Sequence, residues 1–211
     1  MAPNGWVAPV SDSLDAIQLF ENPVLERLTH THFAAPVAIF LLPAAFSLYY
    51  GIMCNLLTGV AAFGLFGAGL LLFTLAEYAM HRGVYHLAPT TPARARFQYT
   101  MHGVHHASLK DKTRLAMPPI LTVFVASLLF FLFHFVLGHA AFGVLAGFVF
   151  GHASYLLVHC SLHVYARPKN ALKRLWHHHA MYHYTQESAA FGVCTTLWDH
   201  VFGTVPRRRS R

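Results

Sequence analysis

Two long stretches without a charged residue constrain this chain more than any other feature. Residues 33–76 and 115–166 contain no Asp, Glu, Lys or Arg. A helix that crosses a bilayer needs about 20 apolar residues, so each stretch is long enough for two crossings. A large soluble core is the alternative, but soluble proteins rarely run so far without a charge. The sequence therefore predicts an all-α integral membrane protein.

Each of these stretches divides at a short turn. Cys54 and Asn55 interrupt the first, and Gly138 and His139 interrupt the second. We therefore expect four transmembrane helices with a helical cap beside them. Small residues in the second and fourth helices predict that these two helices pack closely. The helices are expected at residues 33–53, 56–79, 118–137 and 140–160; the small residues are Gly64, Gly67, Gly69, Gly143, Gly147 and Gly151.

The basic residues are distributed unevenly. The two hairpin turns carry none, whereas nearly all Lys and Arg lie in residues 80–117 and 161–211. Because Lys and Arg favour the cytoplasmic side, we expect both segments, and hence the cap, on that face. The formal net charge of +7 indicates anionic lipid head groups rather than nucleic acid, since the basic residues flank membrane spans.

We expect one domain over residues 1–211. The first 30 residues lack the pattern of a cleavable signal. The 3 cysteines are widely spaced and form no CxxC pair, so they indicate neither a disulfide framework nor a thiolate metal site. The expected parts are an N-terminal segment (1–32), a first helical hairpin (33–79), a histidine-rich segment (80–117), a second hairpin (118–160) and a histidine-rich C-terminal segment (161–211).

Histidines supply the chemistry. Of 17 in the chain, nine form four short clusters at the expected cytoplasmic ends of the helices. Residues three or four apart share a face of an α-helix, so the members of three clusters can each converge on one point. The remaining pair is five apart, and Gly83 between its members offers a break that could bring them together. The clusters are His81/His86, His102/His105/His106, His159/His163 and His179/His183.

Nine imidazoles are too many for one metal ion and indicate two. Neutral imidazole suits iron, copper, nickel or zinc. Soluble di-iron bundles combine Glu with Glu-x-x-His, whereas carboxylates are scarce near these clusters. Glu77, four residues before His81, is a candidate acceptor for an imidazole N–H.

Five segments resemble the membrane fatty acid hydroxylase superfamily, and within it the fatty acyl 2-hydroxylases that act on sphingolipids. The likeness covers about residues 65–206. The segments are 77–86 (EYAMHRGVYH), 102–106 (HGVHH), 111–119 (DKTRLAMPP), 155–163 (YLLVHCSLH) and 191–204 (FGVCTTLWDHVFGT).

This resemblance implies a di-iron centre that uses O2 to hydroxylate a lipid acyl chain, with C2 as the expected carbon. Two electrons would come from a separate protein, cytochrome b5 or a ferredoxin with its reductase. Zinc could replace iron in a purified sample. The membrane would be the endoplasmic reticulum of a eukaryote or the inner membrane of a bacterium.

The last histidine cluster departs from the family pattern His-x-x-His-His. This pattern maps onto His179, Tyr182 and His183, so a tyrosine stands where the middle histidine is expected. Water, Tyr182 or His178 could fill the gap. Tyr155 and Asp199 are further candidates for a role beside the metals.

Basic residues at the same face could hold the polar head of a lipid while its acyl chain lies among the helices. Setting the topology is the simpler role for each of them. The candidates are Lys110, Lys112, Arg114 and Arg167.

Other interpretations stay open. Sterol desaturases, sterol methyl oxidases, carotenoid hydroxylases and bacterial aminolipid hydroxylases use related histidine-rich sites. A metal-ion transporter would instead line a path near the bilayer midplane with ionisable residues. A haem-binding membrane protein would show an intense Soret band.

Overall fold

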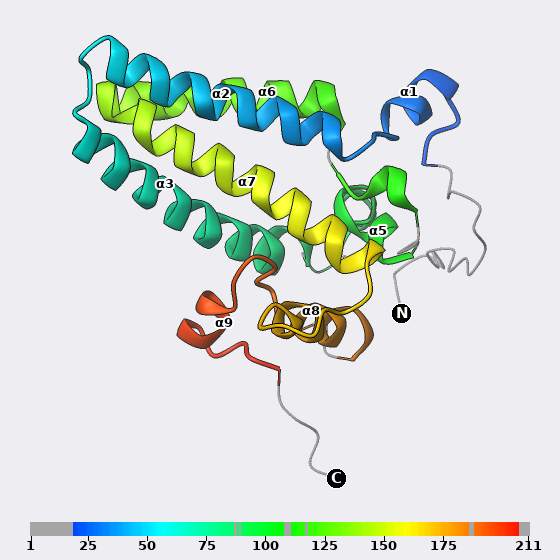
Figure 1. The fold of residues 1–211 in the computed structure, drawn as a ribbon. Helices are drawn as coiled ribbons and strands as arrows, with labels where there is room; N and C mark the ends of the chain where they lie inside the picture. Colours follow the sequence, from blue (N-terminus) through cyan, green and yellow to red (C-terminus); the bar gives the residue numbers. More distant parts are fainter. Residues whose placement is uncertain are drawn as a thin grey trace.

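The computed structural model describes residues 19–86, 88, 90–107, 111–116, 118–185 and 188–206. Every regular element within these residues is helical, which confirms the all-α class. Figure 1 shows the long helices side by side, with a group of short helices at one end of them.

The long helices are close to their expected ranges. The first and last residues of each helix differ from the expected ones by four residues or fewer. The largest difference is at the end of the last helix, which continues to Val164 and so includes His163. Asn55 at φ 55° lies in the turn after the first, and Gly138 at φ 54° begins the turn after the third. The left-handed conformation at Gly138 favours a residue without a side chain. The helices are α2 (Ala34–Met53), α3 (Gly59–Met80), α6 (Pro119–Leu137) and α7 (Ala141–Val164).

Within the part of the chain that the structure describes, three helical segments are long and apolar enough to cross a membrane: Ala34–Met53, Gly59–Tyr85 and Pro119–Val164. The third is 46 residues long and contains both α6 and α7, which fold back on each other at Gly138 (Figure 1). Large apolar side chains on these helices face outward, with Phe63 83% and Phe135 90% exposed. Exposed apolar surface on this scale indicates a surface that lipid covers.

Helix α7 forms the centre of the bundle and packs against the other three long helices. Its contact with α3 includes close approaches of backbone to backbone. A Cβ atom added at Gly69 would lie 2.0 Å from the Val144 carbonyl oxygen, and one added at Gly147 would lie 1.9 Å from the Phe66 carbonyl oxygen. The close packing expected of these glycines is therefore present. The expectation was wrong for Gly64 and Gly67, where an added Cβ would meet nothing within 4 Å.

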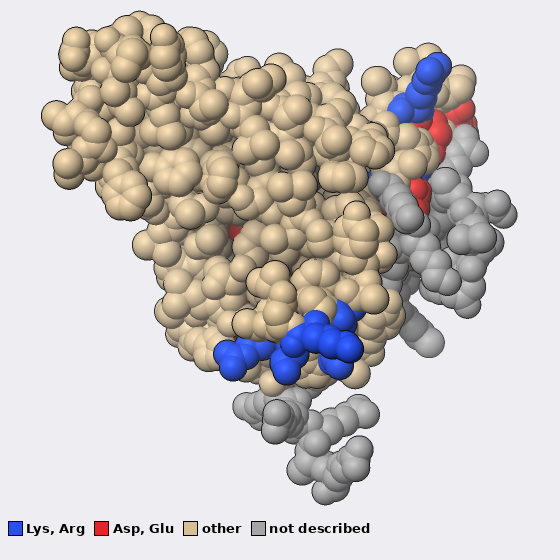
Figure 2. Space-filling view, in the orientation of Figure 1, with Lys and Arg blue, Asp and Glu red and all other residues tan. Residues whose placement is uncertain are grey.

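The short helices gather where α3 and α7 end (Figure 1). On the face drawn in Figure 2, Lys and Arg side chains cluster near α8, whereas the far end of the long helices shows none among the described residues. The short elements are α1 (Pro23–Leu28), η1 (His81–Tyr85), α4 (Pro92–Gln98), η2 (Tyr99–Gly103), α5 (Val104–Ala107), η3 (Lys112–Arg114), α8 (Lys173–Tyr184) and α9 (Leu197–Val201), with η4 (Gly138–Ala140) in the distant turn.

Candidate metal centre

A π-helical turn, η1, brings the first histidine pair together. Helix α3 continues past Met80 into this turn, and the ring centroids of His81 and His86 lie 5.8 Å apart. A π-helix bonds residue i to residue i+5, so it places residues five apart almost above one another. The expected break at Gly83 was wrong. Instead, the wider winding of the π-helix brings His81 and His86 close together.

A second π-helical turn, η2, precedes the short helix α5 and divides the next cluster. His102 and His106 face one site, where their Nε2 atoms are 2.9 Å apart. His105 faces another, with its Nε2 atom 3.1 Å from His163 Nε2. The expectation that these three histidines meet at one point was therefore wrong, because the chain between them changes from π-helical to α-helical winding.

We call the first group site A. The Nε2 atoms of His81 and His102 are 3.3 Å apart. The Tyr182 hydroxyl oxygen lies 2.9 Å from His102 Nε2 and 3.1 Å from His106 Nε2, and it also contacts His86 Nε2. Site A thus consists of His81, His86, His102, His106 and Tyr182.

The second group, site B, is built on two regular helices. His159 and His163 lie one turn apart on α7, with their Nε2 atoms 3.2 Å apart. His179 and His183 repeat this spacing on α8, at 3.0 Å. His163 Nε2 joins the pairs, since it also lies 2.9 Å from His179 Nε2. With His105, site B contains five imidazoles.

Burial leaves several of these imidazoles without charge. It lowers the pKa of His105, His179 and His183, and neighbouring imidazoles lower them further. In site A, burial likewise lowers the pKa of His102, and that of His106 to about 4. A neutral imidazole has one nitrogen with a free lone pair, which is the form that binds a metal ion.

The spacing of the nitrogens fits a bound ion in each site. Two atoms that each lie about 2.1 Å from one ion are separated by about 3.0 Å at a right angle and by about 3.4 Å at the tetrahedral angle. The observed Nε2 separations run from 2.9 Å to 3.3 Å. Sites A and B can therefore each hold a metal ion.

A C-terminal segment braces site A. The His81 Nδ1–H donates to the Phe191 carbonyl oxygen, which leaves the lone pair of its Nε2 atom facing the site. Asp199, fully buried, accepts hydrogen bonds from the backbone N–H groups of Phe191 and Gly192, each at 2.9 Å. Burial alone would raise the pKa of Asp199, but hydrogen bonds, first among them that from His178, lower it overall. The sequence could not indicate a role for the Phe191 carbonyl, because every residue has a backbone carbonyl.

Two of the other candidates take different places from those expected. Glu77 accepts hydrogen bonds from the backbone N–H groups of Val193 and Cys194, at 2.6 Å and 3.1 Å, rather than from an imidazole. It therefore acts on the same C-terminal segment as Asp199. His178 pairs with Asp199, with Nε2 2.9 Å from Oδ2, so this nitrogen is already occupied and does not fill the gap at Tyr182.

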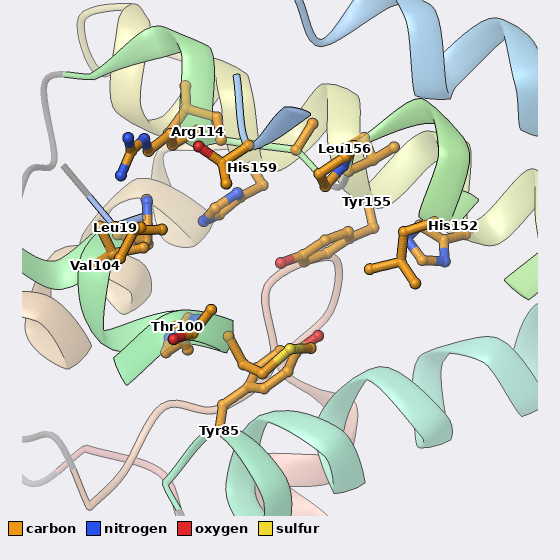
Figure 3. A pocket seen from close by; sticks show the side chains of 17 residues that line it. Leu19, Tyr85, Thr100, Val104, Arg114, His152, Tyr155, Leu156 and His159 are labelled. Atoms are coloured by element: carbon orange, nitrogen blue, oxygen red, sulfur yellow. The ribbon is translucent and has the colours of Figure 1, made fainter. Parts of the chain in front are cut away.

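An apolar cavity of about 220 Å³ opens beside the sites and reaches His102, His105 and His159. Figure 3 shows Tyr155 and His159 on one side of it and Tyr85 opposite them. The Tyr155 ring stacks on His159, with centroids 5.3 Å apart and planes 9° apart. Sequence reasoning missed Tyr85, whose ring stacks on His102 at 4.8 Å.

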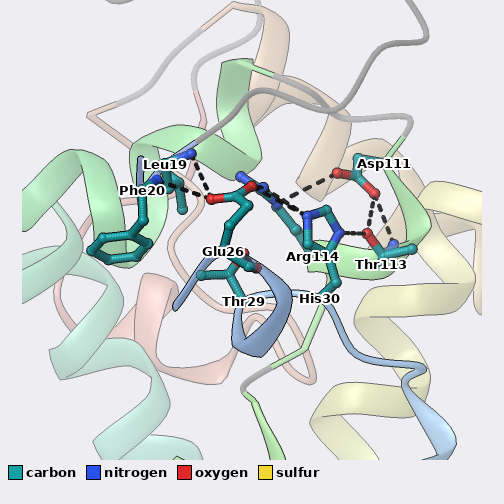
Figure 4. A network of polar contacts seen from close by, with 8 residues as sticks. All are labelled: Leu19, Phe20, Glu26, Thr29, His30, Asp111, Thr113 and Arg114. Atoms are coloured by element: carbon teal, nitrogen blue, oxygen red, sulfur yellow. Dashed lines mark hydrogen bonds and ion pairs between the residues drawn. The ribbon is translucent and has the colours of Figure 1, made fainter. Parts of the chain in front are cut away.

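One basic candidate, Arg114, lines this cavity. Its guanidinium, 5% exposed, pairs with Glu26 and lies 2.9 Å from His30 Nε2 (Figure 4). Its Nη1 makes no hydrogen bond to any described residue. Burial would raise the pKa of Glu26, but hydrogen bonds from the Phe20 and Leu19 backbone, with Arg114 and His30, lower it overall. Arg167 is exposed, Lys110 lies outside the described residues, and so does the side chain of Lys112.

Comparison with known proteins places these features in one family. A family model for fatty acid hydroxylases matches residues 66–204. Dihydroceramide fatty acyl 2-hydroxylase FAH2 of Arabidopsis thaliana is 30% identical over 211 residues, which cover 95% of this chain and 85% of that protein. Ceramide very long chain fatty acid hydroxylase scs7 of Schizosaccharomyces pombe is 35% identical over 191 residues, which cover 88% of this chain but only 54% of that protein.

A solved structure has the same fold. The structure of full-length Scs7p, in which only the hydroxylase domain is visible, aligns with a TM-score of 0.81 at 31% identity. The alignment covers 90% of this chain and 72% of that chain.

Proposed function

The chain belongs to the fatty acid hydroxylase family, and from this premise we propose that it is a membrane di-iron enzyme that hydroxylates C2 of a lipid acyl chain. A ceramide or a similar sphingolipid is the proposed substrate, by analogy with the names of the relatives. The observation that carries the proposal is the pair of histidine sites beside an apolar cavity.

The proposed reaction consumes O2 and two electrons. One oxygen atom enters the C–H bond to give C–OH, and the other leaves as water with two protons. Iron ions bound in both sites would supply the redox chemistry that activates O2, whereas zinc would bind without turnover because it has no redox chemistry. We propose that a separate protein delivers the electrons, either cytochrome b5 or a ferredoxin with its reductase.

We propose that nine histidines bind the two ions. Because burial lowers the pKa of His102 and His105, these imidazoles need not lose a proton before they bind, and the Phe191 carbonyl holds His81 in the matching tautomer. Site A would use His81, His86, His102 and His106; site B would use His105, His159, His163, His179 and His183.

The cavity suits an acyl chain whose polar head lies near the histidines. Leu121 of α6 and Leu156 of α7 line it, and His105 and His159 bound it. Among the basic candidates, Arg114 lies at this cavity with an unused Nη1, so we propose that it binds a carbonyl or phosphate oxygen of the substrate. The carbon next to an acyl carbonyl, C2, would then lie closest to the imidazoles. Arg167, Lys110 and Lys112 remain candidates for outer contacts with the head group.

We further propose that the four long helices all cross the membrane as one domain, with the histidine-rich cap on the cytoplasmic face. The distribution of Lys and Arg supports this orientation. The membrane would be the endoplasmic reticulum in a eukaryote or the inner membrane in a bacterium.

Lipid mass spectrometry under isotopically labelled O2 tests the proposal. Cells that express the chain should contain a lipid whose acyl fragment carries one labelled oxygen at C2. Cells that express His105→Ala should lack it, since this imidazole belongs to site B and borders the cavity.

Other outcomes would contradict the proposed reaction. Loss of two hydrogens without label would indicate a desaturase, and label elsewhere in a lipid would indicate another member of the membrane di-iron oxidases. An unchanged lipid profile despite two bound irons and a supplied electron donor would refute lipid oxidation. A Soret band would indicate a haem protein, and metal flux across vesicles a transporter.

A further inference from the structure

Tyr182 is buried between the two metal sites. Its side chain is 0% exposed, and its ring packs against Tyr78, Ala190 and Phe191. The next residue along α8, His183, belongs to site B, but the Tyr182 hydroxyl points into site A. The oxygen there meets three imidazoles from two separate segments of the chain. These are His86, His102 and His106.

Hydrogen bonding alone satisfies this arrangement poorly. A phenol can donate one hydrogen bond and accept two, and three Nε2 atoms face its oxygen. Two of them, on His102 and His106, also lie 2.9 Å from each other, and His102 Nε2 lies 3.3 Å from His81 Nε2. Because His81 donates from Nδ1, its Nε2 atom carries only a lone pair. His102 Nε2 must then carry a proton, and without a cation this single proton would have to be shared among His81, His106 and Tyr182.

A cation at the centre of site A removes this conflict. The oxygen lies 2.9 Å and 3.1 Å from two nitrogens, the same range as between nitrogens that could share an ion. We propose that the Tyr182 oxygen is itself a ligand of the metal ion in site A. Site A would then offer four imidazoles and one phenolate, and site B five imidazoles. This inference rests on the metal binding that the proposed function requires.

The alternatives for this ligand position are weaker. His178 lies one turn before Tyr182 on α8, but its Nε2 atom is already paired with Asp199 at 2.9 Å. A water molecule would have to displace the phenol oxygen, which already contacts all three imidazoles. Tyrosine oxygen is an established iron ligand, as in the haem of catalase.

The two metal positions would therefore differ in charge. A phenolate carries a negative charge that an imidazole lacks, so it stabilises the ferric more than the ferrous ion. Iron in site A should hold its oxidised state more strongly than iron in site B. In a chain with a tenth imidazole at residue 182, this difference should shrink.

Ferric iron is the probe for the test. The full chain, purified in detergent, is loaded with iron, oxidised and checked for two irons per chain by metal analysis. A phenolate bound to ferric iron gives a charge-transfer band in the visible region, and Raman excitation in that band enhances tyrosine ring vibrations. Imidazole ligands give no such vibrations. We expect the band in the unaltered chain, and a shift of the vibrations when ring-deuterated tyrosine is incorporated.

Three variants identify the tyrosine. Tyr182→Phe keeps the packed ring and should lose the band completely. Tyr182→His replaces oxygen with nitrogen and should also lose it while retaining two irons. Tyr85→Phe is the matched control, because its ring stacks on His102 of the same site at 4.8 Å and it should keep the band.

Each result decides the inference. Two bound irons without a phenolate band in the unaltered chain would overturn it and leave the proposed function intact. A band that persists in either Tyr182 variant would overturn it as well. A chain that binds no iron would overturn both. If Tyr182→Phe fails to fold, the unaltered chain and Tyr182→His still decide.

Discussion

Sites A and B are neighbours built in different ways. The ring centroids of His106 in site A and His183 in site B lie 4.4 Å apart. Site B takes four of its five side chains from regular α-helical pairs on α7 and α8. Site A takes His81 and His102 from two π-helical turns, His86 and His106 from the residues that follow these turns, and Tyr182 from α8. Regular helices hold a site by themselves, whereas irregular turns need support from outside.

Site A receives that support from the C-terminal segment. Asp199 and Glu77 accept four hydrogen bonds from the backbone N–H groups of residues 191–194, and the Phe191 carbonyl accepts from His81. Near site B, the comparable carboxylate, Glu26, holds Arg114 at the cavity and bonds no histidine of the site. Damage to the support of site A should therefore affect metal binding more than damage near the cavity.

The largest expected effect comes from His163→Ala. This imidazole joins site B, since its Nε2 atom lies within 3.2 Å of the Nε2 atoms of His105, His159 and His179. Substitution of a residue that hydrogen-bonds a metal ligand typically lowers metal affinity or activity ten- to a hundred-fold. We therefore expect loss of a ligand itself to lower product formation at least about 100-fold. Metal analysis should find iron falling from two to one per chain.

His139→Ala is the control for this change. His139 is exposed in the turn between α6 and α7, so both irons and the activity should be retained. If His163→Ala kept two irons and full activity, site B would not be a metal site.

The difference between the two sites also explains what the sequence could predict. The charge-free stretches predicted the long helices, and the i, i+4 pairs His159/His163 and His179/His183 predicted side chains that share a face. These patterns work because the α-helix has one fixed period. The family and the all-α class are confirmed, while the metal-binding roles of the histidines stay predictions.

What the sequence could not predict lies mostly in site A. A five-residue spacing does not fit the α-helical period, so it gave no sign that His81 and His86 would meet across a π turn. The division of His102 and His106 from His105 depends on the same change of winding. The hydrogen bond that supports His81 is accepted by the backbone carbonyl of Phe191, which is 110 residues further along the chain.

Asp199→Asn is the next largest change and acts mainly on site A. Asp199 accepts two backbone N–H groups with its two carboxylate oxygens. An Asn side chain has one oxygen, and its NH2 group would face an N–H that needs an acceptor. The segment that carries the Phe191 carbonyl should loosen, and the affinity of site A for iron should fall about ten- to a hundred-fold.

Titration with a chelator can resolve this effect. In the variant, the chelator should remove one iron per chain at a lower concentration than in the unaltered protein. The other iron should be removed at the same concentration as in the unaltered protein. Glu21→Gln, the same chemical change at an exposed carboxylate, should alter neither step. Equal weakening of both irons would mean that the C-terminal segment does not act on site A separately.

A smaller effect is expected from Glu26→Gln, beside the cavity. This change removes the charge that pairs with Arg114 but leaves both histidine sites in place. Partly exposed ion pairs contribute about 0.5–1 kcal/mol, so we expect KM for the lipid to change about two- to five-fold. Iron content should stay at two per chain. A loss of iron instead would show that the cavity wall and site B are one structural unit.

The smallest effect concerns pH and the same carboxylate. The pKa of Glu26 in the folded chain is lowered from its ordinary value of 4.5, so its contribution to holding residues 19–28 is complete above that value. This contribution is lost as the pH falls through the lowered pKa, because the protonated carboxyl no longer attracts Arg114. Amide hydrogen exchange in residues 19–28, corrected for the intrinsic effect of pH, should therefore accelerate below about pH 4.5. In Glu26→Gln the same residues should exchange faster at neutral pH and show no such step, whereas Glu21→Gln should retain it. A step that survives in Glu26→Gln would assign it to another group, such as the site imidazoles.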